Sequence, residues 1–179
     1  MPQHEVWLRG PVPGVPGLLQ PVAHALLQCR EELTANVTGL TPEQIWVRPA
    51  GAASIGFHAR HAAGSLDRLF TYARGEHLTS DQLAVLASEA HPDFSPDVGA
   101  ALVAAFDEAV ERALEQLRLT REATLLEARG VGRAQLPSTV LGLLFHAAEH
   151  TQRHVGQLVT TSKVLSALLA GAIEEGTRP

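Results

Sequence analysis

The chain has 179 residues, of which 45% are hydrophobic and 4% aromatic, and it carries a formal net charge of −5 with a pI near 6.0. This length suits a single domain with a substantial hydrophobic core. The hydrophobic residues are mostly Ala and Leu, which favours packed helices over a β-sandwich. The acidic balance argues against a protein that binds nucleic acid through its phosphates, because such binding requires a basic surface.

The single cysteine, Cys29, cannot form an internal disulfide, so we expect a reducing, cytoplasmic setting. Cys29 falls in the middle of an apolar helical stripe, where a small core residue is a better interpretation than an exposed nucleophile. No apolar run reaches the roughly 20 residues of a membrane span, and the N-terminus lacks the pattern of a signal peptide. We therefore expect no membrane partner.

Residues 1–17 are rich in Pro and Gly, which predicts an extended lead-in with Trp7 and Leu8 against the surface of the protein. Apolar residues at helical spacing then predict a first helix over residues 18–37. Thr41, followed by Pro and Glu, predicts a cap and a single helical turn.

The second helix is predicted to begin with Ser54 as its N-cap and to end at Arg74, with Gly75 as the stop. It carries His58 and His61, which are three residues apart and so lie on neighbouring parts of the helix surface. A mixed connection follows over residues 75–94, with a short helical piece at 80–89.

Ser95-Pro96-Asp97 predicts the start of a third helix, because it combines a capping side chain, a proline at the first position and an acid for the helix dipole. This helix should reach residue 119. The connection over 121–137 contains two arginines and two glycines. These are Arg129, Gly130, Gly132 and Arg133. We interpret the connection as a surface loop in preference to an anchor for a phosphate or carboxylate.

Ser138 is expected to cap a fourth helix that ends near Leu169. Four amphipathic helices of this length predict an all-α protein with an antiparallel four-helix bundle and long connections. The expected organisation is an extended segment over 1–17, the bundle over 18–170 and a C-terminal tail over 171–179.

Three histidines in the fourth predicted helix, His146, His150 and His154, recur every four residues. Positions four apart on an α-helix differ by about 40° and rise about 6 Å, so neighbouring members stack on one face. A helical wheel places His150 and His154 within or beside the apolar stripe and His146 at its edge. Buried imidazoles need a partner for each ring nitrogen, and a metal ion is the simplest partner for two on successive turns.

Either His58 or His61 can supply a third ligand, and the wheel slightly favours His58, which lies nearer the apolar stripe. Three neutral imidazoles leave a divalent ion with an open position, which is a catalytic arrangement. Such an ion lowers the pKa of a bound water or thiol and creates a nucleophile near neutral pH. Zn²⁺, Ni²⁺ and Fe²⁺ all suit imidazole, so the ligands do not choose between them.

Two motifs resemble those of the DinB/YfiT-like metalloenzyme family. Residues 150–157, HTQRHVGQ, resemble its H-x-x-x-H-x-G-Q ending, and residues 54–61, SIGFHARH, resemble its second-helix motif of Ser or Thr with a histidine seven residues on. With the helix order and the long second connection, the resemblance covers most of the chain after about residue 15. It implies a four-helix bundle, usually dimeric, with one divalent metal held by His61, His150 and His154.

The resemblance also implies roles for other residues. With His61 as the ligand, His58 stands behind the metal or faces the substrate; the catalytic residue is unknown, and His58 and His146 are the candidates. Gly64 stands where the family often has an acid, which argues against an acid–base role for that position.

Relatives of this kind include S-transferases that use bacillithiol or mycothiol, and a mycothiol-dependent maleylpyruvate isomerase. The resemblance therefore implies a transferase in which a metal-activated low-molecular-weight thiol attacks an electrophilic small molecule. Two alternatives stay open: a hydrolase that uses metal-bound water, and a non-catalytic homodimer that binds a metal or a ligand.

Overall fold

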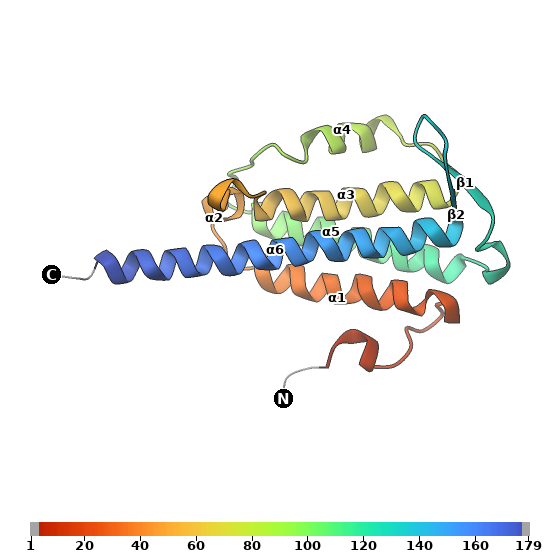
Figure 1. The fold of residues 1–179 in the computed structure, drawn as a ribbon, viewed down its shortest axis with the longest axis horizontal. Coiled ribbons are helices and arrows are strands. Elements are labelled where there is room, and N and C mark those ends of the chain that lie inside the picture. Colours follow the sequence, from red (N-terminus) through yellow and green to blue (C-terminus); the bar gives the residue numbers. More distant parts are fainter. Residues whose placement is uncertain (1–3, 177–179) are drawn as a thin grey trace.

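The computed structural model describes residues 4–176, with side chains to residue 171, and shows α-helices packed as a bundle beside a small β-hairpin (Figure 1). The all-α bundle expected from the sequence is confirmed. Residues 1–3 of the lead-in and 177–179 of the tail lie outside the described residues. The helices are α1 (Gln20–Val37), α2 (Pro42–Trp46), α3 (Ile55–Ala73), α4 (Ser80–Ser88), α5 (Val98–Leu119) and α6 (Val140–Gly176), and the strands are β1 (Ala128–Val131) and β2 (Leu136–Thr139).

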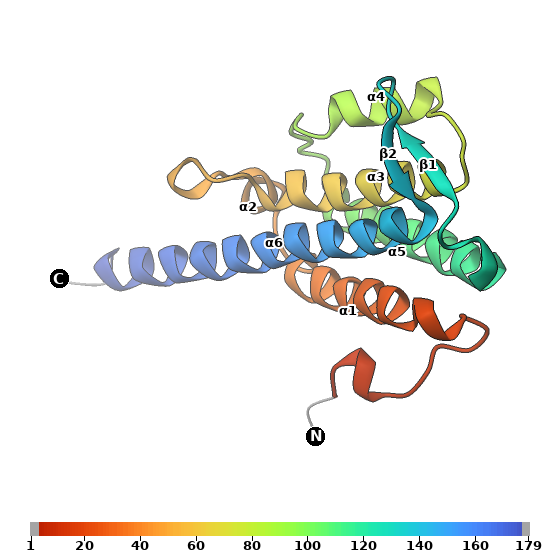
Figure 2. The ribbon, with the colours of Figure 1, turned by 45° about the vertical axis from the view of Figure 1, so that its right-hand side comes forward.

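Four long helices form the bundle, and α6 packs against both α1 and α3, while α5 packs against the other sides of the same two helices. Helices α1 and α6 run in one direction and α3 and α5 in the other (Figures 1 and 2). The pairs α3–α6 and α1–α5 are therefore antiparallel, and the other two pairs are parallel. The parallel pairs arise because the connection between α3 and α5, which contains α4, returns along the bundle before α5 begins.

The core consists of the apolar stripes of these four helices, whose aliphatic side chains meet along the bundle axis. Burying each large aliphatic or aromatic side chain contributes roughly 1.5–3 kcal/mol, so the stripes supply most of the stabilisation. Cys29 is buried in this core, as expected. The largest fully buried side chains include Phe106, Leu26, Leu33, Leu66, Leu117, Leu144 and Leu158.

Several helix starts follow from local hydrogen bonds. Thr41 forms a capping box with Gln44, and the Ser54 hydroxyl accepts a hydrogen bond from the Phe57 amide at 3.2 Å, so both predicted caps are confirmed. The predicted cap at Ser95 is wrong: α5 begins after Asp97, and the Ser95 hydroxyl donates to the Asp93 carboxylate. The aspartate two residues away competes successfully for that hydroxyl.

The lead-in is held by other residues than expected. Val6 and Val15 are buried, whereas Trp7 is 60% exposed and Leu8 is 54% exposed. The Val6 amide donates to the Gln28 side chain at 3.0 Å, which holds Val6 against α1 and leaves Trp7 and Leu8 facing outward. Short 3₁₀ turns, Val6–Leu8 and Gly17–Leu19, interrupt the extended path.

The connection between α5 and α6 contains a hairpin that the sequence pattern did not predict, with β1 antiparallel to β2. Since Ser138 is paired in β2, the predicted cap of α6 is wrong, and the Thr139 hydroxyl accepts from the Gly142 amide instead. Arg129 donates to the Ala73 carbonyl at 2.9 Å and pairs with Glu127. Its donors thus serve the fold, which agrees with the interpretation as a surface loop.

Helix α6 extends to Gly176, past the expected end near Leu169, and its C-terminal part projects beyond the other helices (Figure 1). The Thr160 hydroxyl donates to the Gly156 carbonyl within the helix, and the helix continues through it. Within residues 4–176, no helix is both long and apolar enough to cross a membrane.

Candidate metal centre

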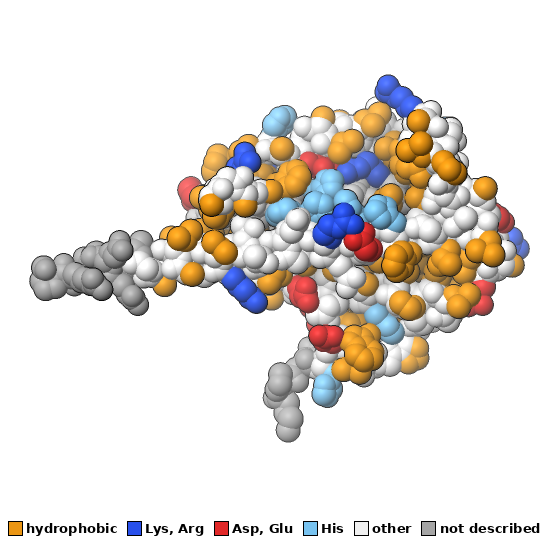
Figure 3. All heavy atoms as spheres, viewed as in Figure 1, with side chains coloured by type: hydrophobic (Ala, Val, Ile, Leu, Met, Phe, Trp, Pro, Cys, Tyr) orange, Lys and Arg blue, Asp and Glu red, His pale blue; other side chains and the backbone are white. Residues whose placement is uncertain are grey.

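The candidate site lies where α3 packs against α6, near the middle of the bundle. Helix α3 contributes His58 and His61, and α6 contributes His146, His150 and His154. Histidines gather on the face shown in Figure 3, over these two helices, with basic and acidic side chains beside them. Because the two helices face each other and each carries histidines at one- or near one-turn spacing, the packing alone brings the rings together.

Three of these histidines converge on one point. His61, His150 and His154 each offer one ring nitrogen, and these nitrogens all lie within 4.8 Å of one another. The Nε2 atoms of His61 and His150 are 2.9 Å apart, and the ring centroids of His150 and His154 are 4.6 Å apart. The triad named by the family resemblance is therefore assembled, and its members can hold a divalent metal.

His58, which the helical wheel favoured, lies beside this group. Its Nδ1 is 3.1 Å from Nδ1 of His154, so one of the two rings donates a hydrogen bond to the other. His58 is 5% exposed, more deeply buried than the triad members. It contacts the His154 ring and also lines a cavity, so both positions that the resemblance implied for it, behind the metal or facing the substrate, stay open.

Burial and neighbouring positive charge favour the neutral form of three of these rings. Burial first, and then the charges of His61, His150 and His58, lower the pKa of His154 to about 4. Burial and the neighbouring His61 also lower the pKa of His150 and of His58. Neutral imidazoles are the form that binds metal ions, and the lowered pKa values of His150 and His154 favour that form at neutral pH.

The donor set and spacing fit a divalent ion. The nitrogens of two imidazoles on one tetrahedral zinc, at Zn–N of about 2.0–2.1 Å, lie about 3.3 Å apart, and the close pair in the triad needs only a small adjustment to match. His150 Nδ1 is buried without a hydrogen-bond partner among the described residues, although buried imidazole nitrogens are normally paired. The contact that an ion would relieve is the close approach of Nε2 of His61 and Nε2 of His150, each of which could turn a lone pair towards the ion.

Two charged residues that the sequence analysis missed support the triad. Glu89, just after α4, accepts a hydrogen bond from His61 Nδ1 at 2.7 Å and another from Arg68 at 2.7 Å. Burial raises the pKa of the Glu89 carboxyl, but the hydrogen bonds from His61 and Arg68 outweigh it and leave that pKa below its ordinary value. Glu89 belongs to an irregular connection, so no periodic pattern indicates it.

His146, the second catalytic candidate, lies at the margin, as the wheel predicted. Its side chain is 51% exposed, and its Nδ1 is 3.5 Å from the carboxylate of Glu149. Glu149 also accepts from Arg153 one turn further along α6. His146 is therefore outside the triad, on the solvent side of His150, whose ring centroid is 5.5 Å from its own.

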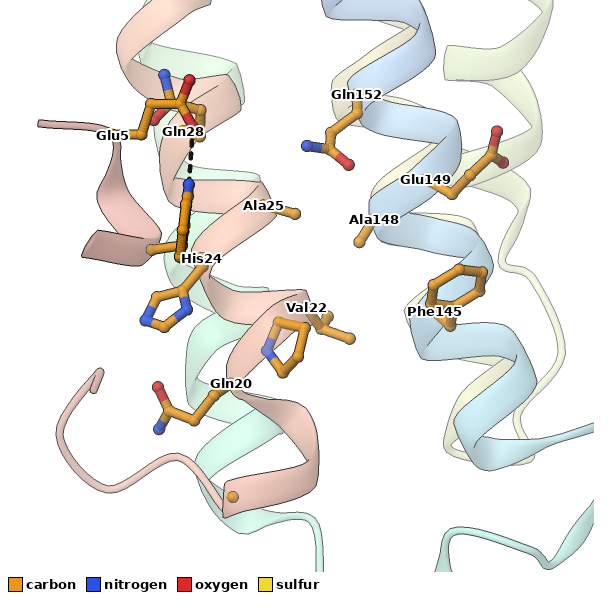
Figure 4. A pocket seen from close by; sticks show the side chains of 13 residues that line it. Glu5, Gln20, Val22, His24, Ala25, Gln28, Phe145, Ala148, Glu149 and Gln152 are labelled. Carbon is orange, nitrogen blue, oxygen red and sulfur yellow. Dashed lines mark hydrogen bonds between the residues drawn. The ribbon is translucent and has the colours of Figure 1, made fainter. Parts of the chain in front are cut away.

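Two cavities lie on this side of the bundle. The smaller has a volume of about 460 Å³, and its wall includes His58, Arg153, Gln157 and Thr161 but none of the triad histidines. A groove of about 700 Å³ lies between α1, α6 and the lead-in. In Figure 4, Ala148 and Gln152 of α6 point towards α1 across this groove, and none of the clustered histidines lines it. Of the two cavities, the smaller one is lined by a histidine of the cluster, His58.

Cys29 takes no part in this chemistry. It is buried in the core, and burial raises the pKa of its thiol to about 12. A thiol with so high a pKa stays protonated and is not a nucleophile. Any thiolate used at the triad must therefore come from outside the chain.

A comparison with protein families adds an independent finding. The model of the DinB superfamily matches residues 25–158, about three quarters of the chain, and this stretch contains all the histidines of the cluster. No curated protein matched the chain in a separate comparison.

Proposed function

This chain belongs to the DinB superfamily, and from that premise we propose that it is a metal-dependent enzyme in which His61, His150 and His154 hold one divalent ion. The observation that carries the proposal is the convergence of three imidazoles on one point, close to a cavity lined by His58, the hydrogen-bond partner of His154. Three protein ligands leave room for one more, which is how catalytic zinc sites differ from closed structural ones.

We further propose that the reaction is the transfer of a low-molecular-weight thiol, of the bacillithiol or mycothiol type, to an electrophilic small molecule. A bound divalent ion of this kind lowers the pKa of a thiol and so supplies a thiolate near neutral pH. The buried Cys29 cannot provide that thiolate, which supports an external thiol. The candidate metals are Zn²⁺, Ni²⁺ and Fe²⁺.

The chain's own residues have distinct tasks in this scheme. His58, neutral because its pKa is lowered, holds the ring of His154 in place and lines the cavity that would admit the substrate. Arg153, at the same wall, offers a guanidinium that can bind an anionic group of the thiol or the electrophile. His146, exposed at the opposite margin, can exchange a proton with solvent.

Metal content and thiol dependence test this proposal. We would purify the protein without a metal-affinity tag, measure divalent metal by mass spectrometry, and assay conjugation of 1-chloro-2,4-dinitrobenzene with bacillithiol, mycothiol and glutathione. About one ion per chain and a thiol-dependent rate that is lost in His154→Ala are the expected results. Metal without thiol dependence, together with ester or amide hydrolysis, would indicate the hydrolase; metal with no activity would indicate a binding protein.

We also propose that the chain forms a homodimer. Support comes from the projecting part of α6, where Val164, Leu168 and Leu169 are 45%, 59% and 43% exposed in the single chain. Light scattering after gel filtration measures the mass directly. Leu168→Glu should shift the mass towards a monomer, whereas Leu136→Glu, at an equally exposed leucine on the hairpin, should leave it unchanged.

A further inference from the structure

The connection between α3 and α5 places one buried residue in the protein, and that residue is Glu89. Between residues 74 and 97 every other residue is exposed or half-buried, and α4 itself contributes no buried side chain. Glu89 is 3% exposed and lies against α3. A carboxylate is an expensive group to choose as the single buried anchor of a segment, unless its charge and hydrogen bonds are needed there.

Both oxygens of the Glu89 carboxylate are used. Oε1 accepts from the guanidinium of Arg68, which is itself 8% exposed, and Oε2 accepts from Nδ1 of His61. An ionised carboxylate can only accept hydrogen bonds, so the proton of His61 is held on Nδ1. In the neutral ring that binds a metal, Nε2 of His61 is then the unprotonated nitrogen, and it is the atom that faces His150 at 2.9 Å.

Gly64 makes room for this arrangement. A Cβ at position 64 would lie 2.5 Å from Oε1 of Glu89 and 2.7 Å from the Arg68 guanidinium, closer than atoms can approach. Residue 64 is three positions after His61 and so shares its face of α3. The space where α3 would carry its own side chain beside His61 is filled instead by a carboxylate delivered from α4.

Glu89 therefore joins two parts of the protein that have few other links. Helix α4 is otherwise held to α3 by Gln82, whose amide donates to Asp67 and Thr71, and by Arg60, which donates to the His91 carbonyl. None of these contacts reaches a ring of the triad. Among the hydrogen bonds of residues 4–171, the one that links the α4 segment to a ring of the triad is the bond between Glu89 and His61.

We propose that Glu89 is a positioning residue that fixes the His61 tautomer, so that docking of α4 and metal binding at the triad are coupled. The inference rests on the metal site put forward under Proposed function, but not on the thiol reaction. Metal binding then tightens the α4 segment, and loss of the Glu89 contact weakens metal binding, because coupling between two events is reciprocal.

Zinc affinity, measured by competition with a chromogenic chelator, tests the coupling in four proteins: the wild type, Glu89→Gln, Glu89→Ala and Gln82→Ala. Partners that orient a metal-binding histidine typically contribute about 10–100-fold in affinity, so we expect both Glu89 variants to weaken zinc binding by about that factor. Gln82→Ala loosens α4 without touching His61, and we expect its affinity to stay within about 3-fold of the wild type.

A fifth protein separates the tautomer from the docking. In Glu89→Ala combined with Gly64→Asp, the space beside His61 is open, and the new carboxylate on α3 can occupy it. We expect this double variant to recover zinc affinity relative to Glu89→Ala. Hydrogen exchange over residues 79–93 should slow on adding zinc to the wild type and should not respond in the double variant.

The outcomes divide cleanly. A wild-type protein that binds no zinc would overturn both the metal site and this inference. A wild-type protein that binds zinc, with Glu89 variants of equal affinity, would overturn the inference and leave the metal site standing.

Discussion

The helices α3 and α6 and the connection that carries α4 contribute to one site in opposite ways. The two helices are regular, bury an apolar stripe and bring His61, His150 and His154 together by their packing. The connection is exposed along nearly its whole length, yet it delivers the Glu89 carboxylate that holds His61. Helical periodicity can therefore place the ligands of a site, whereas the group that orients a ligand can come from a connection whose sequence shows no such periodicity.

The largest expected effects on metal binding come from the triad histidines that α3 and α6 carry. His61→Ala, His150→Ala and His154→Ala each remove one of three candidate ligands, so each should lower divalent-metal affinity by more than the roughly 10–100-fold that an orienting partner contributes. Mass spectrometry of the purified proteins, with chelator competition, measures this. Full metal content in any one of the three would remove that histidine from the site.

Two matched controls use the remaining histidines of the cluster. His58→Ala and His146→Ala should keep about one ion per chain, because neither belongs to the convergent triad. We expect His58→Ala to lower activity more than His146→Ala, since His58 is buried against His154 and His146 is half exposed. Metal loss in His58→Ala with retention in His61→Ala would exchange the roles of the two.

Arg68→Met tests the contact between the α4 connection and α3 through the stability of the protein. It leaves the Glu89 carboxylate buried without its cationic partner, and breaking a buried ion pair costs roughly 3–5 kcal/mol. Urea denaturation of the metal-free protein measures the loss. Arg112→Met is the control, because its ion pairs are long and exposed and should contribute less than about 1 kcal/mol.

Two glycine substitutions, one in α3 and one in α6, should change the stability of the protein in opposite directions. Gly64→Ala forces a Cβ into the Glu89–Arg68 contact, and such overpacking costs about 1–3 kcal/mol. Gly156→Ala, in α6, meets no atom within 4 Å, so the alanine should stabilise the helix by about 0.5–1 kcal/mol. Thermal or urea unfolding should therefore show opposite signs; destabilisation of equal size in both would mean that Gly64 has no special packing role.

Much of the fold follows from the sequence because its helices obey simple local rules. The apolar stripes predicted both ends of α1 and α3 and the start of α6 to within a few residues, whereas α6 runs further than predicted. The caps at Thr41 and Ser54 follow from side-chain chemistry. The hairpin was missed because its four-residue strands carry no alternation of apolar and polar residues. The cap at Ser95 was wrong because Asp93, outside the motif, takes its hydroxyl.

The candidate site divides in the same way. Four-residue spacing was enough to place His150 and His154 on an inward face, but the helical wheel slightly favoured His58, whereas His61 is the residue that joins the triad. That choice depends on how α3 is rotated against α6, which is a property of packing between distant segments. Glu89 and Arg68 were not foreseen, because a buried ion pair between a connection and a helix leaves no local pattern.

Acid should weaken the metal-free protein through the histidines themselves. The pKa of His154 is lowered by burial and by its neighbours to about 4, against an ordinary value of about 6.5. Between these two values the unfolded chain binds a proton that the folded chain excludes, so the free energy of unfolding falls as the pH drops from about 6.5 to about 4. Because the cluster is open to solvent, screening limits the loss to about 1–2 kcal/mol. Urea titrations across this range should show a shallower slope in His154→Gln, while His77→Gln, at an exposed histidine outside the cluster, should retain the wild-type slope; an unchanged slope in His154→Gln would mean that His154 is already charged in the folded protein.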